Sequence, residues 1–181
     1  MKNERRQKMR WVILFVLILL ISFGPDGRID AAGDFRISSS IFEDNGNIPG
    51  KYTCDGANVN PPLKIENVPP ETKSLILILD DRDAPRGTYV HWILWNIHPD
   101  TKEIKENSVP GGAVQGMTDF KKRKYGGPCP PSRAHRYVFK ICALDTRLNL
   151  NPDSTKKDVE KAMKGHVIAE AQMTGLYKRK K

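Results

Sequence analysis

Two histidines, an aspartate and a tyrosine are the side chains whose positions in this sequence favour binding chemistry. Asp81 follows an apolar run, His91 lies near the start of a second strand-like segment, and His135 and Tyr137 begin a third. Imidazole and phenol groups can converge as donors on the oxygens of a phosphate monoester. A nearby carboxylate can fix an imidazole tautomer or accept a hydrogen bond from an ammonium group. The pattern predicts a site for a small anion.

The same residues allow other interpretations, which the sequence leaves open. Asp81 and His135 could serve as orienting group and base in a hydrolase of phosphate or ester substrates, although no serine occupies a nucleophile-elbow motif. Each histidine could instead be structural, with Asp81 capping a turn, in a protein whose role is assembly, for example as a homodimer. The histidines and the three cysteines lack C-x-x-C and H-E-x-x-H spacing, so we expect neither a metal nor a cofactor.

The segments that must position these residues have the composition of β-strands: 74–80, 89–97 and 136–144. The first is a short continuous apolar run, which is typical of a strand buried on both faces. The other two are rich in aromatic and β-branched residues. Alternation places His135 on the same side as Tyr137. In the second segment alternation places four side chains on one face: Tyr89, His91, Ile93 and Trp95.

Near the C-terminus the pattern changes from strand to helix. Ser154 or Thr155 can cap a helix that Gly165 would end. Residues 167–171 could form a second short helix. Residues 173–177 fit either a helix end or a short strand, and the sequence does not decide between them.

Composition indicates one soluble globular domain. The 181 residues are 28% charged and 39% hydrophobic, which excludes collagen, coiled coils and polytopic membrane proteins. Lys plus Arg number 30 against 21 Asp plus Glu, and the formal net charge of +9 favours anionic partners, including a membrane surface. The long Pro- and Gly-rich stretches 45–70 and 109–131 are typical of functional loops. The chain contains no nucleic-acid-reading module, so we expect no nucleic acid partner.

Residues 1–33 have the pattern of a targeting segment. Five basic residues precede the apolar run 11–23, and a Gly-Pro break follows it. A helix over this run would cover about 20 Å of the roughly 30 Å hydrocarbon core of a bilayer. We therefore expect export to the periplasm or the extracellular space, with an uncleaved tether as the alternative, and a single folded domain over residues 34–181.

Several short motifs of the chain resemble one known family. They occur in this order: Tyr52–Gly56 (YTCDG), Leu79–Pro85 (LDDRDAP), His91-Trp92, Tyr125–Pro131 (YGGPCPP), His135–Tyr137 (HRY) and Gly165–Ala171 (GHVIAEA). Together they resemble the phosphatidylethanolamine-binding protein (PEBP) family, and the last motif resembles its prokaryotic branch, the Raf kinase inhibitor-like proteins. Motifs in this order across most of the chain make a chance match improbable.

The resemblance implies a mainly β domain in which a large sheet packs on a smaller one, with C-terminal helices and a small anion pocket at one edge. It also implies binding of a phosphate or phospholipid headgroup and modulation of a partner protease or kinase. The implied ligand positions are Asp81, His91, His135 and Tyr137, and the implied pocket walls are Pro85, Trp92, Gly127 and Pro128. The Ala84–Pro85 bond matches one that is cis in the family.

Four residues depart from the family pattern by adding positive charge: Arg82, Lys121, Lys124 and Arg133. We expect the loss of Pro or Gly at these positions to alter the local loop shape. The cysteines are three in number. Because Cys54 and Cys129 lie in the loops beside the expected pocket, we expect a disulfide between them, with Cys142 buried and free. Three free thiols are the alternative.

Overall fold

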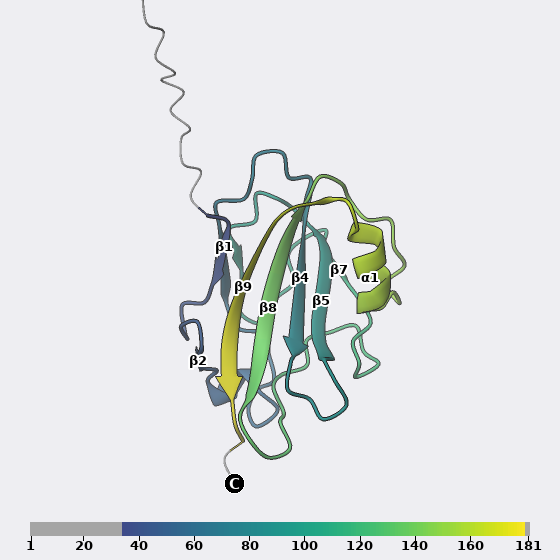
Figure 1. Cartoon of the computed structure of the whole chain (residues 1–181). Helices are drawn as coiled ribbons and strands as arrows, with labels where there is room; N and C mark the ends of the chain where they lie inside the picture. The colour runs from purple at the N-terminus through teal and green to yellow at the C-terminus, as the bar shows by residue number, and fades with distance from the viewer. Residues whose placement is uncertain (1–33, 180–181) are drawn as a thin grey trace, which may run out of the picture. The chain divides into compact units, whose positions relative to one another are not determined.

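A computed structural model describes residues 34–179, which form two β-sheets and one α-helix (Figure 1). The predicted targeting segment lies outside the described residues. Within residues 34–179 no helix is long and apolar enough to cross a bilayer. The elements, in chain order, are β1 (Arg36–Ser38), β2 (Gly46–Asn47), the 3₁₀ helix η1 (Gly50–Tyr52), β3 (Leu63–Glu66), β4 (Ser74–Asp81), β5 (Tyr89–Ile97), β6 (Glu103–Ile104), β7 (Val114–Gln115), β8 (His135–Leu144), α1 (Lys156–Met163) and β9 (Val167–Tyr177).

The larger sheet has the strand order β2-β9-β8-β4-β5-β7, and the smaller sheet has the order β1-β3-β6. Only the β2–β9 pairing among these strands is parallel, so the larger sheet is mixed. The mainly β fold with a large sheet packed on a smaller one, expected from the resemblance, is confirmed. The three strands predicted from composition are confirmed as β4, β5 and β8.

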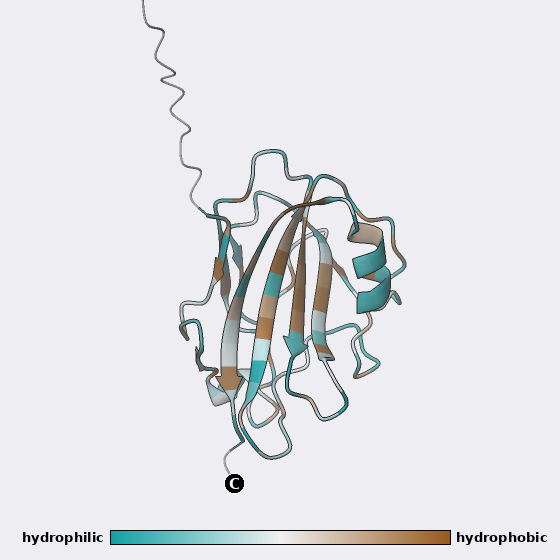
Figure 2. Cartoon of the chain, viewed as in Figure 1, coloured by the Kyte–Doolittle hydropathy of each residue, from teal (hydrophilic) through white to brown (hydrophobic). Residues whose placement is uncertain are grey.

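The central strand β4 is buried along its whole length, as its continuous apolar run predicts. Leu75, Leu77 and Leu79 face the smaller sheet and belong to the core between the sheets. Ile76 and Ile78 face the opposite way, into a second apolar cluster beneath α1. Figure 2 shows the resulting hydrophobic colour along β4 and β5. Burial on both faces gives β4 a fixed register, which in turn fixes the position of Asp81 at its end.

Helix α1 covers the outer face of the larger sheet through Val159 and Met163. Of the two predicted caps the structure uses Thr155, whose backbone N–H donates to the Asp158 carboxylate at 2.8 Å. Gly165 adopts φ 83° just after the helix, a left-handed conformation that favours glycine. The predicted start and stop of this helix are confirmed.

The prediction of a second C-terminal helix over residues 167–171 is wrong. Val167–Tyr177 is one strand, β9, which pairs antiparallel with β8 over its length. The reversal at Gly165 returns the chain beside the free edge of β8, where alternate residues of β9 can form ladder hydrogen bonds. This long-range pairing overrides the weak local preference for helix. Residues 173–177, left undecided above, are therefore strand.

Candidate functional site

The C-terminal end of β4 and the N-terminal ends of β5 and β8 lie side by side at one end of the larger sheet. This arrangement brings the four predicted ligand positions together. Asp81 is the register partner of Tyr89 on one side and of Tyr137 on the other. His135 is at the start of β8. His91 reaches the cluster because the register passes from Leu79–Trp92 to Asp80–Val90 and leaves His91 as the extra residue of a β-bulge.

This bulge corrects the predicted facing of β5. Simple alternation placed His91 with Ile93 and Trp95, but those two side chains lie in the cluster beneath α1. The His91 ring instead contacts Tyr137, which lies on the opposite face, at 5.2 Å between ring centroids. An extra residue reverses the facing of the strand on one side of it, which a period-two pattern cannot show.

Asp81 and His135 form a buried pair. The Asp81 Oδ2 atom lies 2.8 Å from His135 Nδ1, and the side chains are 6% and 3% exposed. The other carboxylate oxygen, Oδ1, accepts the backbone N–H of Asp83 at 2.9 Å. Asp81 therefore both orients the imidazole and caps the turn after β4. Since the carboxylate only accepts, His135 Nδ1 carries a hydrogen, and Nε2 is the atom through which the ring can meet a ligand.

His91 is held by the loop that follows β7. Its Nδ1 lies 2.7 Å from the carbonyl oxygen of Gly126, so Nδ1–H donates and Nε2 is left for other partners. Burial lowers the pKa of His91 below its ordinary value of 6.5, outweighing the opposing effects of the Gly126 carbonyl and the Asp81 carboxylate. His91 is therefore neutral near pH 7. The pKa of His91 would be raised only if the attraction of the Asp81 carboxylate exceeded the cost of burying the charged imidazole.

Tyr137 lies between the two imidazoles and is completely buried. Its ring centroid is 5.2 Å from that of His91 and 6.4 Å from that of His135. Its hydroxyl makes no hydrogen bond of good geometry within residues 34–179, although the Asp81 carboxylate and the Cys129 backbone lie near it. Burial, reinforced by the nearby Asp81 carboxylate, raises the pKa of Tyr137, so the group stays a neutral phenol that can donate. A buried hydroxyl without a partner is a position where a ligand oxygen would be stabilised.

A charged pair missed in the sequence fixes the loop between β4 and β5. Asp83 accepts two side-chain hydrogen bonds from Arg136, at 2.8 and 2.9 Å, and the Arg136 backbone N–H at 2.8 Å. The hydrogen bonds from Arg136 hold the pKa of Asp83 well below its usual range. Both residues lie inside the motifs quoted above, but their pairing depends on β4 and β8 being neighbours.

The peptide bond Ala84–Pro85 is trans, since residues 34–179 contain no cis bond, and the cis bond expected from the resemblance is wrong for this chain. The loop reverses instead at Gly87, which adopts φ 96° and donates its N–H to the Ala84 carbonyl. A glycine at this φ supplies the turn without a cis peptide. Pro85 is exposed.

The other implied wall residues are buried beside the cluster. Trp92 is 1% exposed, and its indole N–H donates to Gln115. Gly127 packs so closely on the 50–58 segment that a Cβ there would lie 2.6 Å from the Tyr52 carbonyl oxygen. The Pro128 carbonyl accepts the Cys54 N–H at 3.1 Å. Only glycine fits position 127, because two of the three obstructing atoms belong to the backbone of Tyr52 and Thr53 and cannot move aside.

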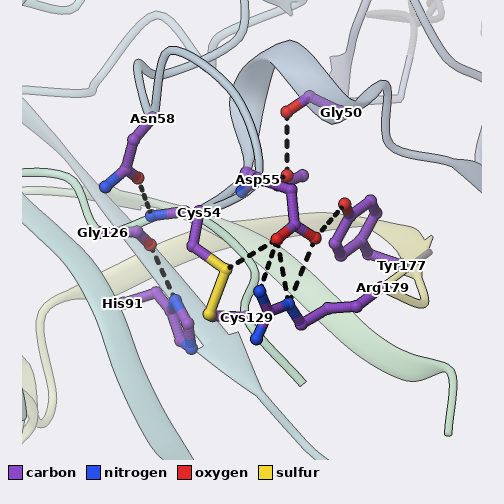
Figure 3. The surroundings of a disulfide bond; sticks show 11 residues. Gly50, Cys54, Asp55, Asn58, His91, Gly126, Cys129, Tyr177 and Arg179 are labelled. Atoms are coloured by element: carbon purple, nitrogen blue, oxygen red, sulfur yellow. Dashed lines mark hydrogen bonds and ion pairs between the residues drawn. A yellow bond between two sulfur atoms is a disulfide. The ribbon is translucent and has the colours of Figure 1, made fainter. Parts of the chain in front are cut away.

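The structure contains a Cys54–Cys129 disulfide, with Cα atoms 5.4 Å apart, and Cys142 is free and buried. Figure 3 shows this bond with the His91–Gly126 contact and with Asp55. Asp55 accepts hydrogen bonds from the Tyr177 hydroxyl and from the Arg179 guanidinium. The disulfide thus joins the loop that holds His91 to a segment anchored on the chain's C-terminal strand. Burial raises the pKa of Cys142 to about 12, so this thiol is unreactive near neutral pH.

Two aromatic residues lie against His91: Tyr89, which alternation placed on the His91 face, and Phe120, which the sequence did not single out. The ring centroids of Phe120 and Tyr89 are 5.0 and 5.5 Å from that of His91. Phe120 is 37% exposed and covers the imidazole from outside. Phe120 directly precedes the basic run 121–124. An aromatic residue next to a run of charges was the sequence feature that could have identified Phe120 as part of the site. Lys121, one of the four departures, adopts φ 58°, the conformation that a glycine at this position would accommodate without strain.

Acidification should destabilise the protein through His91. The unfolded imidazole takes up a proton below its ordinary pKa of 6.5, whereas the folded one resists protonation because its pKa is lowered. The unfolded state then binds more protons, so the free energy of unfolding falls as the pH drops below 6.5. Urea unfolding at pH 7.5 and pH 5.5 should show a larger loss for the wild type than for His91→Gln. Equal losses in the two proteins would contradict this prediction.

Comparisons with known proteins agree with the fold. Residues 38–178 match the model of the phosphatidylethanolamine-binding protein family. A UPF0098 protein of Methanothermobacter thermautotrophicus is 49% identical over 149 residues, which cover 80% of this chain and 99% of the relative. The crystal structure of a Chlamydia trachomatis protein described as a putative PEBP homologue is 38% identical, covers 81% of this chain and 99% of its own, and superposes with a TM-score of 0.79. That of Escherichia coli YbcL, described as a new member of the mammalian PEBP family, is 29% identical, covers 82% and 100%, and has a TM-score of 0.77.

Proposed function

The chain belongs to the phosphatidylethanolamine-binding protein family, and from this premise we propose that it binds a small phosphate-like anion, such as a phospholipid headgroup, at the site formed by Asp81, His91, His135 and Tyr137. In this proposal the protein is a binding module rather than an enzyme. Its ligand would regulate contact with a partner protein, with a protease or a kinase as the expected partner class.

The observation that carries the proposal is the partnerless hydroxyl of Tyr137 between two imidazoles whose Nδ1 atoms are already engaged. Both imidazoles therefore have only Nε2 left for a ligand. A phosphate oxygen can accept from the Tyr137 hydroxyl and from His135 when that ring is protonated. His91 is neutral in the free protein, so it would accept from a protonated phosphate oxygen or take up a proton as the anion binds.

The two oxygens of Asp81 already accept hydrogen bonds from His135 and from the Asp83 backbone. This favours a positioning role for Asp81 over direct capture of an ethanolamine ammonium group. Asp81→Asn should consequently weaken binding of inorganic phosphate and of phosphoethanolamine to a similar extent. A loss confined to phosphoethanolamine would instead indicate that the carboxylate contacts the amine.

Both His91→Ala and His135→Ala should weaken the binding of inorganic phosphate about tenfold or more. Each change removes an imidazole that forms one charge-assisted hydrogen bond with the phosphate. Calorimetric titration at pH 7 measures this effect. His166→Ala is the matched control, because that histidine is exposed and pairs with Asp145 at 2.8 Å, away from the cluster. Unchanged affinity in both cluster variants would refute the proposed site.

A hydrolase is the second candidate, and the 2.8 Å contact between Asp81 and His135 is the observation that favours it, because a base with an orienting carboxylate is half of a nucleophile-activating arrangement. No serine or threonine hydroxyl within residues 34–179 is hydrogen-bonded to His135. Turnover of a chromogenic ester panel that disappears in His135→Ala would support hydrolysis. Absence of turnover with retained phosphate binding would support the binding module.

We also propose that the domain works outside the reducing cytoplasm. The Cys54–Cys129 disulfide supports this location, because such bonds persist mainly in oxidising compartments. Cell fractionation should recover the folded domain with the exported proteins, either free or attached to the membrane.

A further inference from the structure

A hollow of about 160 Å³ lies beside the histidine cluster, with Gly126 and Gly127 in its wall, and the four cluster residues do not line it. Its walls include Lys122, Lys124 and Phe120, together with the disulfide. Neither lysine forms an ion pair with another residue of the described part of the chain. No carboxylate lines the hollow, so its potential is set by two uncompensated ammonium groups.

A second, larger hollow of about 320 Å³ adjoins the first, since Asn58, Lys124 and Tyr125 line both. It too has no carboxylate in its lining, which consists mainly of polar side chains. Lys124, one of the residues that depart from the family pattern, therefore lies where the two hollows meet. A ligand held at this lysine could extend from one hollow into the other.

The amide side chains of these hollows present donors. The Oδ1 atom of Asn58 accepts the Gly127 N–H at 2.7 Å, and the Oε1 atom of Gln115 accepts the Trp92 indole N–H at 2.9 Å. Each of these amide oxygens already accepts one hydrogen bond, whereas the two amide nitrogens donate to no other residue of the described part of the chain and are available to a ligand. Together with the Lys124 ammonium they form a wall of donors, and the complementary ligand is rich in acceptors.

We propose that these two hollows form a second anion-binding site, distinct from the histidine cluster, for a phosphate monoester with a small hydroxyl-bearing substituent. The phosphate lies between Lys122 and Lys124 and accepts from the Asn58 amide. The substituent occupies the larger hollow, where the Gln115 amide donates to its hydroxyl oxygens. Charge-assisted hydrogen bonds from two ammonium groups supply most of the affinity.

Titration of the full ¹⁵N-labelled chain with inorganic phosphate, followed by backbone amide shifts, tests the site. Two groups of amides should shift with separate saturation curves, one near Gly127 and Lys124 and one near His135. The double variant Lys122→Gln/Lys124→Gln should weaken only the first curve, by tenfold or more. The control Lys121→Gln/Lys178→Gln removes the same charge from residues that do not line the hollows and should leave it within about twofold.

Two isosteric variants test the donor wall without touching a lysine. Asn58→Asp keeps an oxygen to accept the Gly127 N–H but replaces the donor with a carboxylate, so it should abolish the first curve. Gln115→Glu should remove any preference for glycerol 3-phosphate over inorganic phosphate at this site.

Absence of a saturation curve near Gly127 and Lys124 in the wild type, or equal weakening of that curve by the two lysine double variants, would overturn the second site. Loss of only the curve near His135 in His135→Ala would leave it standing. Failure of the second site is thus distinguishable from failure of the histidine site.

Discussion

Replacement of both Cys54 and Cys129 by serine should lower the free energy of unfolding by about 4 kcal/mol, because the bond closes a loop across a sequence separation of 75 residues. The cross-link restricts the unfolded chain, and a long loop loses more entropy on closure than a short one. Urea denaturation under oxidising conditions measures this loss.

Reduction of the wild type supplies the control for this prediction. A phosphine reductant should destabilise the wild type to the level of the double serine variant and leave the variant itself unchanged. Cys142 stays a thiol in both proteins, so its contribution cancels. Phosphate affinity should also fall on reduction, since the loop that carries the Gly126 carbonyl, and with it the His91 ring, loses its covalent attachment to Cys54. Equal stability of the oxidised and reduced wild type would contradict the prediction.

His135→Ala should destabilise the fold by about 3 kcal/mol, in addition to its effect on phosphate binding, because it leaves the Asp81 carboxylate buried without its imidazole partner. The side chain of Asp81 is 6% exposed, so water cannot fully replace the lost hydrogen bond. The backbone N–H of Asp83 still donates to Oδ1 of Asp81 in this variant. The expected loss of stability is therefore at the lower end of the range for breaking a buried ion pair.

A double-mutant cycle separates this effect from simple loss of packing. Addition of Asp81→Asn to His135→Ala should restore part of the stability, since a neutral amide is less costly to bury than a carboxylate. Phosphate binding should not return, because the imidazole is still missing. If His135→Ala costs less than about 0.5 kcal/mol, the pair contributes nothing to folding and the carboxylate is solvated in the native state.

The sequence by itself determined the parts of this protein that depend on neighbouring residues. The apolar run of β4 predicts a strand buried on both faces, and the spacing of Thr155 and Gly165 predicts the start and stop of α1. The motifs likewise name the side chains that gather at the sheet edge. These predictions succeed because burial of consecutive apolar residues and helix capping act within a few residues along the chain.

The tertiary structure alone decided the facing of His91, its protonation state and the identity of β9. The first depends on one extra residue in β5 relative to β4, and the second on how much water the loop around Gly126 excludes. The third depends on the free edge of β8. The tertiary structure likewise decided the trans peptide bond before Pro85 and the hydrogen-bond donors at Asn58. Each of these features results from segments far apart in the chain that compete for the same hydrogen bond or the same space. A local sequence pattern carries no information about that competition.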